Sequence, residues 1–353
     1  MHPNATKASM SVAADPELPQ RLYKGGSLQF RTEPACKSSC YNCVDALNLM
    51  RTRIIASAAV GILSGAFCWF LMKHLHQGAA DFGWAIHLAQ RVVARQNPYD
   101  TPFEQYPLPA ALFGLPFLPF APELAAGLFW GISSSLLAFG LTRQGYTRLL
   151  VFLAYPYWAG ILTVQWSPII AASAFFPSLF AVTMAKPQVG FPVFVTHLTR
   201  RGVLMCVIVA CATIVIKPNW PLLWLRQTAN YQHFIPLLVL PGPLLLLALL
   251  RYRERSTWLL LASALMPQRW FFDSFTLWLI PRSRREILWT AFLSWGAGVW
   301  RWYHVPQTFV DVGRCTVVSI YLPMMVLLML RRTRRGQQQS SREQARTDSG
   351  EST

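Results

Sequence analysis

The chain has 353 residues, of which 53% are hydrophobic and 13% charged, and its mean hydropathy is +0.32. About a quarter of the residues of an ordinary soluble protein are charged, so the composition excludes that class. The net charge of +17 would suit a nucleic-acid-binding protein. However, no basic face with interleaved exposed aromatic residues appears outside the apolar runs, so we expect no nucleic acid partner.

Lysine and arginine instead occur in short clusters between apolar runs, a pattern typical of cytoplasmic loops held by anionic membrane lipids. These clusters are Arg51 and Arg53, Arg200 and Arg201, and the basic stretches within 251–255, 282–285 and 331–335. We therefore expect membrane lipids as partners and a multi-pass location, most simply the plasma (inner) membrane of a bacterium.

The first 50 residues are polar and aperiodic, which predicts a disordered cytoplasmic tail, and Met50 is an alternative start. Three cysteines there, Cys36, Cys40 and Cys43, form "CKSSCYNC". We interpret them as reduced thiols; a zinc site is the alternative, although it would need a fourth ligand and no histidine lies nearby. The first apolar run contains no small-residue cleavage site and indicates an anchor rather than a signal peptide.

Apolar runs recur from residue 54 to residue 330, and each is nearly long enough to cross a hydrocarbon core of roughly 30 Å. We place spans near 54–73, 106–120, 124–141, 149–163, 167–184, 187–199, 203–217, 235–250, 257–267, 270–281, 286–302 and 313–330. The pair 257–267 and 270–281 could also be one bent helix or a hairpin. The pattern predicts an all-α, polytopic integral membrane protein with about 10–12 transmembrane helices in residues 51–330. A disordered polar tail is expected over 331–353.

An even number of spans places both termini and the basic clusters on the inner side. Four polar stretches then lie outside, namely 74–105, 217–234, 268–270 and 301–313. Arg143 and Arg148 also fall outside, against the rule, so either a span is misplaced or these arginines act at the outer face. No internal repeat is visible, which weakens a transporter interpretation because many transporters are built from repeated halves.

The outer stretch "DFGWAIHLAQRVVARQNPYD" (81–100) has helical periodicity. Its apolar face comprises Phe82, Ala85, Ile86, Ala89 and Val93, and its basic stripe comprises His87, Arg91 and Arg95. We predict an amphipathic helix on the membrane surface, beginning at Asp81 and ended by Pro98. Asp81 could be no more than an N-terminal helix cap, with the arginines facing lipid phosphates.

Four segments in this order resemble glycosyltransferase family 87, a branch of the GT-C superfamily of integral-membrane transferases that use polyprenyl-phosphate sugars. They are "DFGWAIHLAQRVVARQNPYD", "QYPLPAALFGLPFLPFAPELAAGLFW", "VQWSPIIAASAFFPSLFAVTMAKPQVGFPVF" and "ALMPQRWFFDSFTLWLIP". The third has "VQ" where that family usually has "GQ", and the fourth has "QRWFF" where it has more polar versions. The resemblance covers residues 54–281 and implies a GT-C-like fold.

The resemblance also implies a reaction. A hexose, by family analogy mannose, would move from a polyprenyl-phosphate donor to a glycan or lipid acceptor on the periplasmic or extracellular face, with inversion at the anomeric carbon. It maps the general base of the family onto Asp81, a role that a carboxylate can fill. No cofactor is implied beyond the donor substrate, and the absence of an Asp-x-Asp cluster leaves a divalent metal without support.

The departing phosphate needs cations or fixed donors. Candidates on the outer side are Arg91, Arg95, Lys186, Lys217, Arg226, His233, Arg269, Arg301 and His304, many of which could instead be interfacial charges. We favour Lys186 and Arg269, which lie in motif-like segments, and Gln165 as a donor to sugar or phosphate. Asp273 is a functional candidate as an intramembrane acid, or it pairs with Arg269 one helical turn away.

Aromatic residues in the predicted outer loops allow two interpretations: an interfacial belt, or platforms that stack on sugar rings. They are Trp220, Trp224, Tyr231, Trp302 and Tyr303. The rival functions are a transporter or lipid-handling protein, and a degenerate family member that binds lipid without transfer.

Overall fold

The computed structural model describes residues 35–100, 105–229 and 231–331, with side chains from Leu47 onwards. It divides into two compact units, Met1–Asn48 and Leu49–Thr353. The described part of the first unit is helical backbone, and the side chains of Cys36, Cys40 and Cys43 lie outside the described residues, as do the predicted tails before residue 35 and after Arg331. All that follows concerns the second unit.

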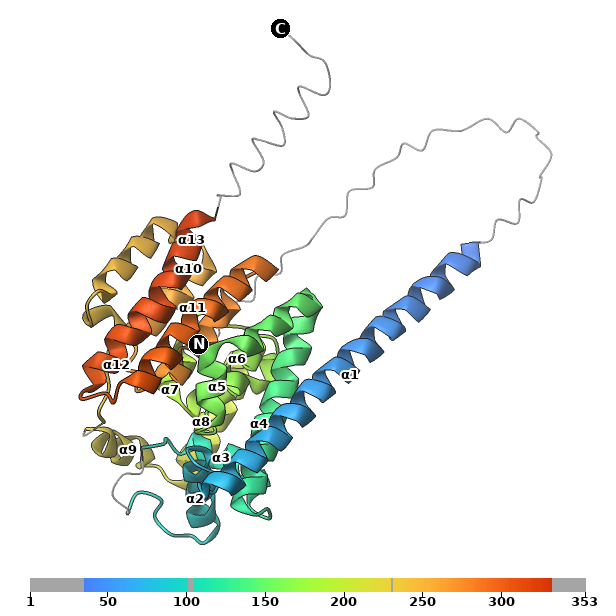
Figure 1. Cartoon of the computed structure of the whole chain (residues 1–353). Helices are drawn as coiled ribbons and strands as arrows, with labels where there is room; N and C mark the ends of the chain where they lie inside the picture. Colours follow the sequence, from blue (N-terminus) through green and yellow to red (C-terminus); the bar gives the residue numbers. More distant parts are fainter. Residues whose placement is uncertain (1–34, 101–104, 230, 332–353) are drawn as a thin grey trace, which may run out of the picture. The chain divides into compact units, whose positions relative to one another are not determined.

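The described residues are helical, without a β-strand (Figure 1). The α-helices are α1 (Ala35–Leu75), α2 (Phe82–Val93), α3 (Pro109–Gly114), α4 (Pro122–Leu141), α5 (Tyr155–Ile161), α6 (Ser167–Ser173), α7 (Pro187–Thr196), α8 (Arg200–Ile216), α9 (Trp220–Thr228), α10 (Arg255–Leu265), α11 (Arg284–Tyr303), α12 (Phe309–Thr316) and α13 (Leu322–Leu330). The 3₁₀ helices are η1 (Leu115–Phe117), η2 (Thr142–Gln144), η3 (Tyr146–Leu153), η4 (Pro177–Met184), η5 (Pro236–Leu238), η6 (Gly242–Arg251) and η7 (Phe271–Leu279), and a π-helical turn, η8 (Val317–Tyr321), joins α12 to α13.

Three helical stretches among the described residues are long and apolar enough to cross a membrane: Leu47–Leu75, Pro122–Gln144 and Phe309–Leu330. A fourth would be the pair α8 and α9, which is bent by 95°. Helix α1 shows why an apolar solvent is needed, because Ile62 and Leu63 are 70% and 71% exposed. Apolar side chains exposed on this scale are stable in lipid and costly in water. The chain is thus an all-α protein with the character of a membrane protein.

Several of the remaining predicted spans form shorter or broken helices, whereas 286–302 lies within the continuous helix α11 (Arg284–Tyr303). Residues 106–120 contain only the six-residue α3 and the short η1, and α3 packs against α2. Residues 167–184 divide at Pro177 into α6 and η4. Prolines explain both breaks, because a proline inside a helix removes a backbone donor and clashes with the preceding turn.

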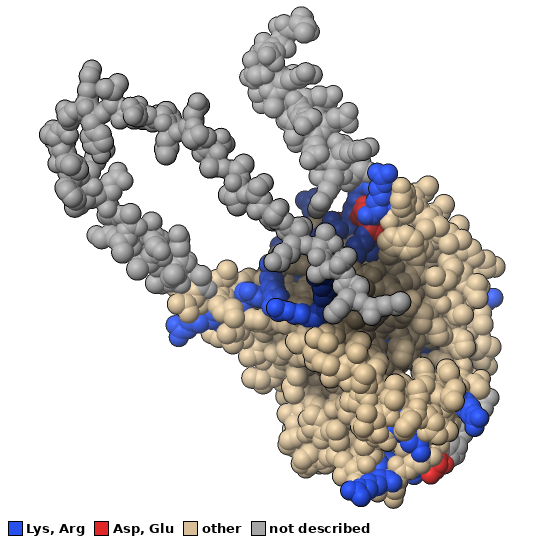
Figure 2. Space-filling view, turned by 180° about the vertical axis from the view of Figure 1, so that it is seen from behind, with Lys and Arg blue, Asp and Glu red and all other residues tan. Residues whose placement is uncertain are grey.

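Three of the basic clusters predicted to lie inside meet at one end of the unit, around Arg251, Arg282 and Arg331. Arg331 pairs with Glu286 at 2.8 Å and donates to the carbonyl of Ile280 at 2.7 Å. Arg251 donates to the carbonyl of Met329 at 3.0 Å. In Figure 2, blue Lys and Arg atoms gather mostly toward the upper and lower parts of this face, and most of the surface between them is tan. Charge at two ends with an uncharged belt between them is the pattern that a bilayer favours.

Arg143 and Arg148 belong to this same end, which favours the first of the two explanations that the sequence left open, a misplaced span. Thr52, at the start of the apolar part of α1, lies 2.7 Å from the Tyr146 hydroxyl. Arg53 donates to the carbonyl of Phe139 at 3.1 Å. The misplaced element was the predicted span 106–120, which does not run the length of the unit. Helix α4 therefore leads the chain back to the end of the unit that contains Thr52 and Arg53 of α1.

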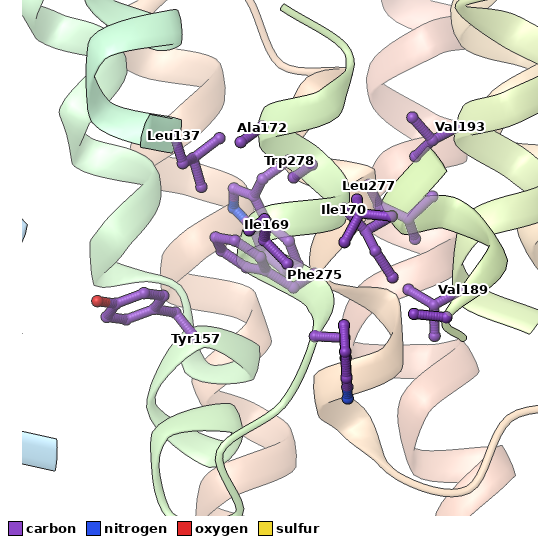
Figure 3. Close-up of a cluster of buried hydrophobic side chains, with 14 of the residues drawn as sticks. Leu137, Tyr157, Ile169, Ile170, Ala172, Val189, Val193, Phe275, Leu277 and Trp278 are labelled. Atoms are coloured by element: carbon purple, nitrogen blue, oxygen red, sulfur yellow. The ribbon is translucent and has the colours of Figure 1, made fainter. Parts of the chain in front are cut away.

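The unit has a buried apolar core. Figure 3 shows Ile169, Ile170 and Leu277 of α6 and η7 near Phe275 and Trp278, with Val189 and Val193 of α7 to one side. Phe275 is also 5.6 Å from the ring of Tyr157 on α5. This core packs the broken helices together and fixes where their ends lie.

Helices α1 and α4 approach each other through glycines. A Cβ built on Gly65 would lie 2.7 Å from the carbonyl oxygen of Gly127, and one on Gly61 would lie 2.8 Å from that of Gly131. Both glycine pairs are spaced four apart, the arrangement that lets membrane helices bring their backbones into contact.

Replacing Gly65 by leucine is therefore expected to push α1 away from α4. The obstacle is backbone rather than a movable side chain, so we expect a loss of about 1–3 kcal/mol of stability. Thermal unfolding in detergent, followed by circular dichroism, measures the loss. Leu63→Ile, at an exposed position on the same helix, is the matched control and should unfold as the wild type does; equal melting temperatures for both variants would contradict the close packing.

Candidate functional site

A pocket of about 250 Å³ opens where the predicted outer stretches meet. Its lining residues come from segments far apart in the sequence: Ala80, Asp81, Trp84, Gln105, Tyr106, Pro107, Thr163, Gln165, Ala185, Lys186, Gln188, Tyr231, Arg269, Trp270 and Phe272. Phe234 and Gln268 join two of these segments by a β-bridge, with N···O distances of 2.9 and 2.8 Å. Residues from all four segments that carry the family resemblance thus line one cavity.

Asp81 lies at this pocket, at the start of α2. Its side chain does not cap the helix, which removes the simplest alternative role. Instead Oδ2 accepts a hydrogen bond from the Tyr106 hydroxyl at 2.6 Å and lies 3.5 Å from Nζ of Lys186. The side chain remains 24% exposed, and its backbone N–H donates to the carbonyl of Thr163 at 3.0 Å. The carboxylate is held firmly and is still accessible.

Lys186 is the buried centre of the site, with a side chain only 6% exposed. Its Nζ lies 3.0 Å from Oδ1 of Asp273, hydrogen-bonds to Oε1 of Gln165, and sits 5.2 Å from the centre of the Phe272 ring. Burial by itself lowers the pKa of the amine, but the carboxylates of Asp273 and Asp81 outweigh it and raise the pKa to about 12. Lys186 is therefore a permanent cation at neutral pH.

Of the two alternatives for Asp273, a side-chain ion pair with Arg269 is not formed. Asp273 is fully buried and pairs with Lys186, while its Oδ2 accepts from the backbone N–H of Arg269 at 3.0 Å. The Arg269 guanidinium lies over the Tyr231 ring at 5.4 Å and donates to Oε1 of Gln105 at 3.4 Å. Its Nε is buried without a partner among the described residues, so Arg269 has hydrogen-bonding capacity left for a ligand.

Broken helices explain how these residues reach one place. Helices α2 and α7 begin immediately after Asp81 and Lys186, and η7 begins just after Trp270. Their first backbone N–H groups are unpaired within the helix and carry partial positive charge, which favours an anion near the pocket. Pro187 is favourable at the first position of α7, since a backbone N–H there would have had no partner within the helix.

Two residues that precede the site have left-handed backbone conformations. They are Ala80, with φ of 46°, and Val164, with φ of 51°. A β-branched residue such as valine rarely adopts this conformation, and strain of this kind tends to gather at functional sites. Val164 stands where the resembling family usually has glycine, a residue that would take this φ without strain.

Two predicted donor-binding residues lie away from the pocket. Arg91 donates to the carbonyl of Asn97 at 2.9 Å, and Arg95 is exposed with φ of 55°. Neither lines the pocket, and the same holds for Lys217, Arg226, His233, Arg301 and His304. The basic side chains at the pocket are Lys186 and Arg269, the two that the motifs favoured.

The amphipathic helix forms as predicted but differs in detail. Helix α2 ends at Val93, before Pro98, and Val93 is exposed whereas Leu88 is buried. Its apolar face packs inside the protein rather than on lipid: the Phe82 ring stacks on Phe129 of α4 at 3.9 Å. The neighbouring helices α3 and α4 cover the surface that the sequence alone assigned to the membrane.

Among the pocket residues that sequence reasoning overlooked are Tyr106, Trp84 and Gln105. Tyr106 holds the Asp81 carboxylate, and Trp84, one turn after Asp81, lines the pocket and is 40% exposed. All three lie within the segments that resemble family 87, and this position was the signal by which sequence analysis could have found them.

Burial raises the pKa of Tyr231 to about 12, with Asp273 adding to the rise, so this pocket residue stays a neutral phenol.

Comparison with protein-family models, curated proteins and solved structures gives no match.

The ion pair of Lys186 and Asp273 is open to a direct test. Lys186→Met leaves a fully buried carboxylate without its cation, which is expected to cost about 3–5 kcal/mol. Adding Asp273→Asn removes the unpaired charge, so the double variant should regain much of the loss. Thermal unfolding of the wild type, both single variants and the double variant at neutral pH measures the coupling; strictly additive losses would contradict the pair.

The same pair predicts a pH dependence. The pKa of Lys186 is raised from 10.5 to about 12 in the folded protein. Its contribution to stability is therefore fully present below about pH 10.5 and is lost as the pH rises through about 12. The melting temperature of the wild type should fall in this window more than that of the double variant.

Proposed function

We propose that the protein is a membrane glycosyltransferase that moves a hexose from a polyprenyl-phosphate donor to a hydroxyl of a glycan or lipid acceptor. The observation that carries the proposal is the Asp81 carboxylate, which is partly exposed at a pocket also lined by the buried Lys186 and the half-buried Arg269. The reaction needs a base for the acceptor hydroxyl and cations for the leaving phosphate, in a protein with membrane character. The resemblance of the four motifs to family 87 adds mannose as the sugar and inversion as the stereochemical course.

In this proposal Asp81 takes the proton of the acceptor hydroxyl. The acceptor oxygen forms a bond to the anomeric carbon while the bond from that carbon to the phosphate oxygen breaks, and the electron pair leaves with the polyprenyl phosphate. Tyr106, which donates to Oδ2 at 2.6 Å, keeps the other carboxylate oxygen free for the acceptor. A positioned base of this kind contributes about 10²–10⁴-fold to the rate.

The leaving phosphate gains negative charge, and fixed positive groups stabilise that charge. Arg269 has an unpartnered Nε, and the contact of Lys186 with Asp81 is long, at 3.5 Å. Both cations can therefore turn toward a phosphate without giving up the pair between Lys186 and Asp273. The N-terminal amides of α7 and η7 add to the same field.

A transporter would need a polar path that continues through the unit. Helices α6 and η7 also contribute Ile169, Ile170, Phe275 and Leu277 to the buried apolar core (Figure 3). The pocket thus ends on a packed core, which favours chemistry at one face over passage through the protein.

Asp81→Asn is expected to lower transfer at least about 100-fold while leaving the protein folded, since the amide keeps the shape but cannot accept a proton. The assay supplies labelled polyprenyl-phosphate mannose to membranes and follows label in the acceptor fraction. Asp100→Asn is the matched control, because Asp100 is an exposed acid after the same helix and does not line the pocket. Near-normal transfer by Asp81→Asn would overturn the assignment.

The proposal also places the pocket on the outer face of the membrane. In a cysteine-free background, Gln232→Cys lies in a pocket-side segment and Arg285→Cys lies at the opposite, basic end, and both side chains are exposed. A membrane-impermeant maleimide should label Gln232→Cys in intact cells and Arg285→Cys only after permeabilisation. The reverse pattern would place the pocket inside.

A further inference from the structure

A buried arginine lies at the basic end of the unit, apart from the pocket. Arg148, on η3, is 2% exposed, and its Nη2 donates to the carbonyl of Trp278 at 3.5 Å. Its Nε and Nη1 are buried without a hydrogen-bond partner among the described residues. A charged, buried guanidinium needs acceptors, because an unsatisfied buried charge is costly. Arg148 therefore has hydrogen-bonding capacity that its protein surroundings do not use.

The acid that acts on Arg148, Glu286, is already occupied by other donors. Its carboxylate accepts from the Arg331 side chain at 3.2 and 2.8 Å and from the backbone N–H groups of Arg282 and Ser283. Among the described residues, no carboxylate forms an ion pair with Arg148. Burial, opposed in part by Glu286 and aided by Arg331 and Arg282, lowers the pKa of the Arg148 guanidinium to about 10. It is still a cation at neutral pH.

A second guanidinium with a free donor lies at the same end of η7. Arg331 donates through Nη2 to the carbonyl of Ile280 at 2.7 Å, two residues after the carbonyl of Trp278 that accepts from Arg148. Nη1 of Arg331 is also buried without a partner in the described part of the chain. The exposed Arg282 adds a third positive charge. We name Arg148, Arg282 and Arg331 the arginine cluster.

The cluster lies close beneath the surface of the unit. Tyr146 and Thr147, which directly precede Arg148, are exposed, and so is Arg282 on the other side. The hydrogen bond that Arg148 makes to the Trp278 carbonyl is long, at 3.5 Å, and is therefore weak. A small rotation of this guanidinium toward a ligand thus gives up little.

We propose that the arginine cluster binds the phosphate of an anionic membrane lipid. Phosphate oxygens are strong acceptors, and they match the donor geometry of guanidinium groups better than any other common biological anion except carboxylate. Such a site differs from the general attraction of basic loops to lipid, because a buried side chain supplies its donors. It does not depend on the proposed transferase reaction, since the cluster shares no residue with the pocket.

Exposed apolar side chains beside the cluster favour a lipid over a free phosphate ion. Leu330, next to Arg331, is 79% exposed, and Trp289 and Phe292 on α11 are 64% and 70% exposed. The same helix carries Glu286, which pairs with Arg331 at 2.8 Å. An amphiphile can therefore place its phosphate at the cluster and its acyl chains along the apolar surface of α11.

Thermal unfolding of the full-length protein tests the site. Dodecylmaltoside micelles are mixed with phosphatidylglycerol or with phosphatidylcholine of the same acyl chains, at equal ionic strength. Phosphatidylglycerol at about 100 times its dissociation constant should raise the melting temperature by about 5 °C, whereas phosphatidylcholine should add little. Arg148→Met should lose this gain. The matched control Arg285→Met, which removes an exposed charge at the same end, should keep it.

Three results of this experiment would overturn the proposal. Equal gains for the wild type and Arg148→Met, or equal losses in both variants, would show only a general attraction between anionic lipid and a basic protein. A gain from inorganic phosphate as large as that from phosphatidylglycerol would mean a free anion rather than a lipid. A much lower melting temperature of Arg148→Met in phosphatidylcholine would mean that the protein alone already satisfies the guanidinium, because removal of an uncompensated buried charge costs little.

Native mass spectrometry with Arg148→Lys gives a second measurement that does not require the methionine variant to fold. Lysine keeps the positive charge but offers fewer donors and no planar fork. The variant should bind phosphatidylglycerol about tenfold more weakly than the wild type, and Arg285→Lys should bind it equally well. Equal affinities of the wild type and Arg148→Lys would contradict a built phosphate site.

Discussion

The site depends on one buried cation. Lys186 is only 6% exposed and must be compensated, because an unpaired ammonium in an apolar interior is very costly. Its partners come from three different segments: Asp273 on η7, Asp81 before α2 and Gln165 before α6. Because the charge can be satisfied only when these segments meet, the lysine specifies how the broken helices are arranged at this end of the unit.

The breaks in the helices serve the same purpose. Continuous helices would carry only side chains toward the centre of the unit. Interrupted ones bring backbone N–H groups and helix N-termini to the pocket, where they favour an anionic ligand. The left-handed residues Ala80 and Val164 stand immediately before Asp81 and Gln165, and the bond from Asp81 N–H to the Thr163 carbonyl ties the two turns together. Two of the four non-glycine residues with left-handed backbone in the described part of the chain thus directly precede residues of the site.

The apolar surroundings strengthen the electrostatic interactions of the few polar groups at the site. Beneath the pocket lies a packed core, and the outer surface of α1 is apolar and exposed. Charges inside such a medium interact more strongly than in water. A pocket lined by the Asp81 carboxylate and by the cations of Lys186 and Arg269 can therefore both bind an anion and move a proton.

The sequence by itself determined the all-α character, the membrane-like composition and the separation of basic clusters from polar loops, since hydrophobicity and charge act residue by residue. It also singled out Asp81, Lys186, Gln165, Arg269 and Asp273 through their motifs. It misplaced the span at 106–120 and therefore the side of Arg143 and Arg148, because apolar runs look alike whether they cross the unit or fold back on α2.

Only the tertiary structure determined which residues pair and which helices pack together. A spacing of four residues suggested an ion pair between Arg269 and Asp273, but the Asp273 carboxylate pairs with the buried Lys186 instead. Periodicity gave α2 an apolar face, but α4 rather than lipid covers it. Such choices depend on contacts between segments distant in the chain, where burial sets the cost of every unpaired charge, and no local pattern in the sequence contains that information.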